Sequence, residues 1–175
     1  MIDDVRYPIG PYVPADPPSA QELDALLNEL AAAPQRLRDA TSGLTAEQLA
    51  TPYRPGGWTV AQVVHHLADA HLNWYLRTKF AVAESAPMVM PFDENTWVDL
   101  PDNDPHDIVL SLQMVEAVCA KWVVLQRALT PQQWKRTMVH PQRGEFVLDR
   151  LLGMQVWHSK HHTAHILNLR ARKNW

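Results

Sequence analysis

The chain has 175 residues, which suits one domain spanning 1–175 and leaves no need for a second. Hydrophobic residues make up 46% and charged residues 20% of the chain, so its composition excludes the disordered and collagen-like classes. The formal net charge of -3 argues against nucleic acid as a partner, because a nucleic-acid-binding surface must be basic to neutralise phosphates.

The first segment of the chain, residues 1–18, predicts an extended arm over the surface, because its prolines cannot sustain a helix. The arm lacks the charged-then-apolar layout of a signal peptide. We find no apolar run that approaches the roughly 20 residues of a membrane helix. We therefore expect a soluble cytoplasmic protein without a membrane partner.

A first helix is expected directly after the arm. Ser19 and Glu22 have the spacing of a capping box, and leucines follow at helical spacing. Pro34 should kink this helix or end its first half, and Gly43 closes the region.

A second long helix is expected from about 58 to 83. It follows a turn at 51–57, and Thr59 with Gln62 gives its capping signal. Residues 85–105 then contain several prolines and a cluster of Asp and Asn, which predicts a loop. The loop is longer than most connections in compact domains, and this favours a functional role.

The remaining chain predicts two more long helices. Asp104 as N-cap and Pro105 as first helical residue should start one that reaches Leu129. A short helix to about Arg136 and a hairpin-like excursion at 140–146 follow, and the last helix should span 147–172. Four amphipathic helices without a strand series indicate an all-α protein, and a four-helix bundle is the economical architecture.

Four histidines lie on the last predicted helix, and they form two pairs with a spacing of four residues: His158 with His162, and His161 with His165. Residues one turn apart share a helix face, so two imidazoles can converge on one metal ion. The stripe through His158 and His162 is the more apolar one, so we predict that this pair points inward and the other does not.

The second helix supplies the candidate for a third ligand. His66 lies on the apolar side of that helix, whereas His65 falls on a more polar flank, so His66 is preferred. Three imidazoles leave coordination positions open, as in a catalytic metal site. A zinc-protease motif would place Glu where Ser159 stands, and the chain has no Glu-x-x-His motif of di-iron bundles.

Further candidates surround this predicted site. Asp69 could orient a ligand or lie on the surface, and Asp93 and Glu94 could act as acid/base groups or cap a helix. Arg54 could pair with an anionic substrate group, and Trp97 could line a pocket.

Three segments carry a family resemblance: WTVAQVVHHLADAH, PFDENTW and WHSKHHTAHI, with YPIG and YRPGGWTV in support. They resemble the DinB superfamily, and within it the YfiT-like metal hydrolases, which include bacillithiol transferases. The resemblance implies a four-helix bundle, often a homodimer, with nickel or zinc held by His66 (or else His65), His158 and His162. Where classical DinB sequences often carry Gln, this chain has His165, which places it in the YfiT-like branch.

Three functions remain open at this stage. The first is a metal-dependent transferase that conjugates a low-molecular-weight thiol such as bacillithiol to small electrophiles. The second is a hydrolase that uses metal-bound hydroxide as nucleophile. The third is a non-catalytic helical stress or binding protein with structural histidines.

Overall fold

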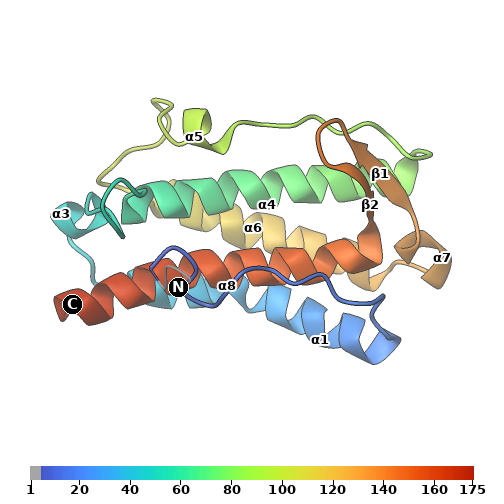
Figure 1. The fold of residues 1–175 in the computed structure, drawn as a ribbon, viewed down its shortest axis with the longest axis horizontal. Helices are drawn as coiled ribbons and strands as arrows, with labels where there is room; N and C mark the ends of the chain where they lie inside the picture. Colours follow the sequence, from blue (N-terminus) through green and yellow to red (C-terminus); the bar gives the residue numbers. More distant parts are fainter. Residues whose placement is uncertain (1–4) are drawn as a thin grey trace.

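Four long helical segments form a bundle in the computed structural model, which describes residues 5–175 (Figure 1). They are α1 with α2 (Ala20–Ala31 and Ala33–Thr41), α4 (Val60–Ala83), α6 (Val109–Arg127) and α8 (Leu148–Lys173). Both α4 and the first segment contact α6 on one side and α8 on the other, which closes the bundle around a common core. The predicted all-α four-helix bundle is confirmed.

The first segment of the bundle is divided where the sequence predicts a break. α1 begins after Ser19, whose side chain accepts from the Glu22 backbone N–H while the Glu22 carboxylate accepts from Ser19 N–H. Pro34 lies in the first turn of α2, where its missing N–H is tolerated, and Ala32 separates the two helices.

Three short helices connect these segments. They are α3 (Ala46–Leu49), α5 (Glu94–Trp97) and α7 (Pro131–Trp134), and their N-caps are Thr45, Asp93 and Thr130. In each case the cap side chain accepts a hydrogen bond from a backbone N–H of the first turn, which otherwise has no partner within the helix. α5 lies in the long loop after α4.

The predicted start of the third helix at Pro105 is wrong, because α6 begins only at Val109. Asp104 Oδ1 accepts from the backbone N–H of His106, and Asp107 Oδ1 accepts from that of Val109. These side-chain-to-backbone bonds favour turns over the first helical turn.

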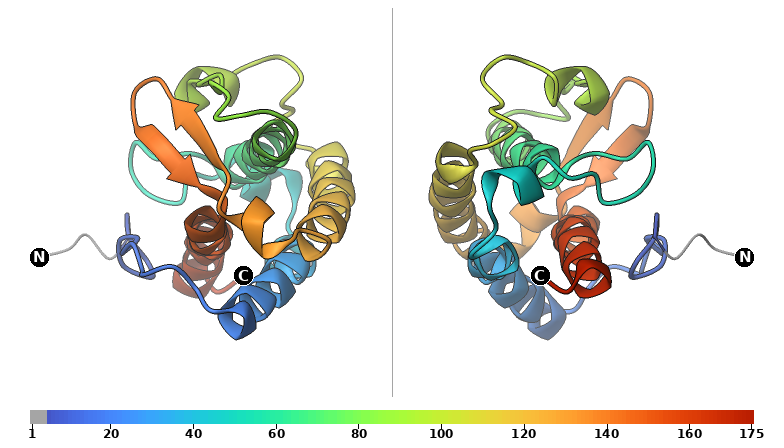
Figure 2. Two further views of the ribbon diagram at one scale, coloured as in Figure 1. Left: turned by 90° about the vertical axis from the view of Figure 1, so that its right-hand side faces the viewer. Right: turned by 90° about the vertical axis from the view of Figure 1, so that its left-hand side faces the viewer.

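The hairpin-like excursion expected at 140–146 is part of a two-stranded β-hairpin. Strands β1 (Thr137–His140) and β2 (Gly144–Val147) pair antiparallel, and His140 lies opposite Gly144. β1 contacts α4 and β2 contacts α8, so the hairpin covers one side of the bundle where these helices meet (Figure 2).

α6 is apolar enough, with a mean hydropathy of 1.4, to meet a length-and-composition test for a membrane-spanning helix. It nevertheless contains Glu116 and Lys121, and it packs against α4, α1 and α2. A core helix of a soluble bundle passes the same test. Cys119, on this helix, is buried and free.

The N-terminal arm contains turns at residues 5–10, is without helix or strand from there to the start of α1, and runs along α8, as expected for a proline-rich segment (Figure 1). Residues 1–4 lie outside the described part of the chain.

Candidate metal centre

Three imidazoles from two neighbouring helices meet between α4 and α8. His158 and His162 are one turn apart on α8, and His66 faces them from α4. His66 Nε2 lies 3.1 Å from His158 Nε2, and one ring nitrogen from each of the three histidines lies within 4.8 Å of the others. This is the cluster that helix periodicity indicates.

All three rings are neutral at pH 7 because their surroundings disfavour a charge. Burial, followed by the charge on His71, lowers the pKa of His66 to about 3. Burial lowers the pKa of His158 and His162 well below the ordinary value, and the neighbouring histidines of the cluster lower it further. The neutral imidazole is the form that binds a metal ion.

The histidine cluster fits one divalent cation. Its nitrogen lone pairs converge, yet the only hydrogen bond within it joins His66 and His158 among residues 5–175. The buried Nδ1 atoms of His66 and His162 have no hydrogen-bond partner in that part of the chain. Trp58 packs 4.7 Å from the His66 ring and 6.0 Å from the His162 ring, between centroids, and holds both rings in place. Three such ligands leave coordination positions open.

His65, the alternative third ligand, already uses both ring nitrogens. Its Nε2 donates to the Asp104 carbonyl at 2.9 Å, and its Nδ1 accepts from the Ser111 hydroxyl at 2.7 Å. The ring therefore joins α4 to the loop before α6 and to the first turn of α6, and it has no lone pair free for a metal.

The prediction that His161 and His165 point away from the interior is wrong, because both are buried. His165 Nε2 donates to the Arg6 carbonyl at 3.1 Å, and the Tyr53 ring stacks on His165 at 4.0 Å between centroids. Tyr7 covers His161. The N-terminal arm thus buries a helix face that the bundle alone would leave exposed.

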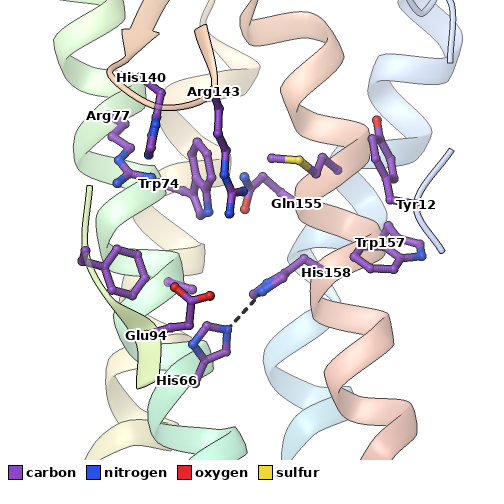
Figure 3. Close-up of a pocket in the computed structure, with 13 residues that line it drawn as sticks. Tyr12, His66, Trp74, Arg77, Glu94, His140, Arg143, Gln155, Trp157 and His158 are labelled. Atoms are coloured by element: carbon purple, nitrogen blue, oxygen red, sulfur yellow. Dashed lines mark hydrogen bonds between the residues drawn. The ribbon is translucent and has the colours of Figure 1, made fainter. Parts of the chain in front are cut away.

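The predicted acid/base candidates have three different surroundings. The Asp93 carboxylate caps α5 and accepts from Asn95 N–H and the Thr96 hydroxyl. Asp69 is half-buried, and burial together with the charge on Asp102 raises its pKa to about 6, but it makes no hydrogen bond to a histidine of the described chain. Glu94 lies beside His66 (Figure 3).

Two cavities flank the histidine cluster. The first, of about 190 Å³, is lined by His66, His158 and Glu94 together with aromatic side chains. The second, of about 280 Å³, is lined by His162 and by Arg6 and Arg54. Arg54, which is predicted to pair with an anionic substrate group, therefore lines a cavity beside the cluster. Trp97 lines neither cavity and packs instead on Phe92, which lines the first.

Sequence reasoning missed several side chains of the first cavity. Arg77, His140, Arg143 and Gln155 all line it (Figure 3). A periodic signal for Arg77 was present, since residues 66, 70, 74 and 77 all line the cavity from one face of α4. Arg143 carries no such signal, because the hairpin brings it to the site.

Comparisons with known proteins identify the family of the chain. The sequence pattern of the DinB superfamily matches residues 29–166. YfiT of Bacillus subtilis (strain 168) is 44% identical over 172 residues, covering 98% of this chain and 97% of YfiT. A protein of Bacillus cereus (strain 03BB102), named provisionally as a metal-dependent hydrolase, is 42% identical over 175 residues, covering 99% of this chain and 100% of that protein.

A solved structure gives the same answer for the fold. The structure of YfiT from Bacillus subtilis, described as a probable metal-dependent hydrolase with an unusual four-helix bundle topology, matches with a TM-score of 0.95 at 43% identity. The match covers 98% of this chain and 99% of that chain.

Proposed function

The chain belongs to the DinB superfamily, and on that premise we propose that it is a metal-dependent transferase that joins a low-molecular-weight thiol, of the bacillithiol type, to small electrophiles. His66, His158 and His162 hold the ion, zinc or nickel, in this proposal. When bound, the ion supplies positive charge that favours the deprotonated form of a thiol.

The observation that carries the proposal is the position of the histidine cluster between two cavities. His66 and His158 line the first, and His162 lines the second. A transferase must hold two organic substrates so that their reacting atoms meet, and proximity of this kind supplies a large part of the rate. A hydrolase has water as its second substrate and needs one such cavity.

Glu94 is the side chain that we assign to proton transfer, because it lines the first cavity next to His66. In the proposed reaction the thiol proton passes to the Glu94 carboxylate and the sulfur bonds to the electrophilic carbon. The leaving group departs with its bonding electron pair. An epoxide oxygen then takes up the proton from Glu94, whereas chloride leaves as the free anion and Glu94 passes the proton to water. Asp93 is committed to capping α5, and Asp69 lines neither cavity.

The second cavity suits the thiol cofactor. Arg6 and Arg54 line it, and neither forms an ion pair with a carboxylate of residues 5–175. Arg54 donates to the Tyr53 hydroxyl and the Pro55 carbonyl, which positions its guanidinium at the cavity wall. An anionic group on the thiol would pair with these cations.

A hydrolase is the second candidate function, and the names of the Bacillus relatives favour it. It uses the same histidine cluster and the same Glu94, with water in place of the thiol. The two readings differ in one measurable property, which is whether turnover needs a thiol. A non-catalytic binding protein would take up metal and turn over neither substrate.

The deciding experiment assays the metal-loaded protein with a chlorinated aromatic or an epoxide, with and without bacillithiol. We expect turnover that requires both metal and thiol and saturates with each substrate. Glu94→Gln should lower kcat by about 100-fold at unchanged metal content. Glu84→Gln removes the same charge from an exposed position outside both cavities and should leave kcat unchanged. Equal turnover without thiol would replace this proposal with the hydrolase.

The proposal includes two properties of the whole protein. It acts in the cytoplasm, where low-molecular-weight thiols are kept reduced. It also assembles as a homodimer, as the family resemblance implies, and light scattering on the purified protein measures this directly.

A further inference from the structure

The first cavity holds an arginine that no carboxylate of residues 5–175 neutralises. Arg77 is only 5% exposed and donates to the Met90 carbonyl, and its guanidinium carbon lies 4.6 Å from the centroid of the Trp74 ring. None of the ion pairs within residues 5–175 includes it. A buried cation without a counter-charge lowers the stability of the folded state, so Arg77 is suited to bind an anionic ligand.

A second arginine faces the same space from the hairpin. Arg143 extends from the turn between β1 and β2 into the cavity, opposite Arg77 (Figure 3). Its charge is felt across the cavity, because it helps to lower the pKa of Arg77 and of His140. Arg143 also forms no ion pair with any described residue. Two guanidinium groups without an ion-pair partner in the described part of the chain therefore share one small cavity.

An amide completes the set of unused donors. Gln155 is 3% exposed and lines the same cavity, and its buried Nε2 has no hydrogen-bond partner among residues 5–175. The cavity does contain one carboxylate, that of Glu94, but it lies at the other end beside His66 (Figure 3). The cavity is thus divided into a cationic end rich in N–H donors and an end that contains the histidines.

We propose that Arg77 and Arg143 bind a carboxylate group of the substrate and thereby direct the rest of that molecule toward His66 and His158. Guanidinium groups present paired N–H donors that match the two oxygens of a carboxylate. Trp74 and Phe92 also line this cavity, so the group attached to the carboxylate is small and apolar or aromatic. That the carboxylate belongs to a reacting substrate rests on the proposed function. That Arg77 and Arg143 bind a carboxylate does not depend on it.

Binding is tested on the metal-free protein, so that no ion can capture the carboxylate. Calorimetric titration compares benzoate with benzamide, which has the same shape without the charge. We expect benzoate to bind saturably and at least about tenfold more tightly than benzamide. Equal affinity for the two, or no binding of benzoate, would overturn the proposal.

Two substitutions localise the binding. Arg143→Gln should weaken benzoate binding by about tenfold, and it is a safe change because Arg143 lies in an exposed turn. Arg150→Gln is the matched control, since Arg150 is exposed on α8 outside the cavity. The same loss in both variants would mean that only the overall charge matters, and the site would be abandoned.

Kinetics then identify which substrate carries the carboxylate. Cysteine is compared with cysteamine as thiol, and 4-(chloromethyl)benzoate is compared with its methyl ester as electrophile. Because the proposed function places the thiol in the second cavity, Arg143→Gln should raise KM for 4-(chloromethyl)benzoate and leave KM unchanged for its methyl ester and for both thiols. An unchanged KM for all four would show that the site does not serve the reaction. Absence of turnover with every pair would defeat the proposed function while the benzoate result still stood.

Discussion

His65 and His66 are neighbours on α4, but their surroundings give the same substitution opposite consequences. His66→Ala should remove bound metal, because it takes away one of three converging nitrogens, and His158→Ala and His162→Ala should act likewise. His65→Ala should keep the metal and lower the free energy of unfolding by about 2 kcal/mol, since two hydrogen bonds are lost. Elemental analysis and urea unfolding measure the two effects.

The result that would contradict this assignment is specific. If His65→Ala lost the metal and His66→Ala retained it, the third ligand would be His65 and not His66. If none of the variants at positions 66, 158 and 162 lost metal, the cluster would not be a metal site at all.

The raised pKa of Asp69 makes the free energy of unfolding depend on pH. Burial raises its folded-state pKa to about 6, above the unfolded value of about 3.9. The folded state therefore favours the protonated acid. The contribution of Asp69 to the free energy of unfolding is therefore largest below about pH 3.9. It is lost as the pH rises through about 6.

Asp69→Asn should abolish this dependence. Because Asp69 is half-exposed, we discount the full shift for solvent screening and expect the variant to be about 1 kcal/mol more stable than the wild type at pH 7.5. The gain should disappear near pH 4. Urea unfolding at both pH values measures it, and Asp16→Asn, at an exposed position of the arm, is the control. A gain of the same size at both pH values would disprove the explanation.

At the scale of elements, α8 begins with a buried carboxylate that depends on one cation. Asp149 is 2% exposed, and its Oδ2 lies 2.6 Å from Lys135 Nζ. Lys135→Met should lower the free energy of unfolding by about 2 kcal/mol, because it leaves a buried charge with only the N-terminal helix dipole to stabilise it. Chemical denaturation measures the loss.

The control for this ion pair is Lys160, on the same helix. Lys160 pairs with Glu29 at 3.0 Å, but both side chains are well exposed and Glu29 also pairs with Arg36. Lys160→Met should therefore change the free energy of unfolding by at most about 0.5 kcal/mol. Equal effects of the two substitutions would mean that burial of Asp149 does not set the strength of its interaction.

The sequence predicts elements well where local chemistry determines them. Capping pairs such as Ser19 with Glu22 mark helix starts, because one residue's side chain bonds the other's backbone. Helix spacing likewise selects His158 and His162. Prediction from the sequence fails where distant segments meet. His165 is buried in contact with Arg6 of the arm, and Arg143 reaches the cavity because β1 pairs with β2, which no periodicity in the sequence indicates.

At the scale of the molecule, the core and the histidine cluster are separate structures. Trp122 is fully buried, and its Nε1 donates to the Thr78 hydroxyl, which joins α6 to α4 away from the cluster. Leu30, Leu37 and Leu152 are also buried in this core, in which the first helical segment packs against α8. A bundle with such a core does not need a metal ion to fold, in contrast to a small zinc finger.

Removal of the metal should therefore abolish activity while the helices persist. We expect chelation to leave the far-ultraviolet circular dichroism spectrum unchanged and to lower Tm by only a few degrees, since an ion that binds the folded state alone stabilises it by mass action. Added zinc or nickel should restore activity and Tm together. A His66→Ala protein provides the control, because chelator should not change its Tm. If the helical signal collapsed on chelation of the wild type, the ion would hold α4 and α8 together, and the three histidines would form a structural site.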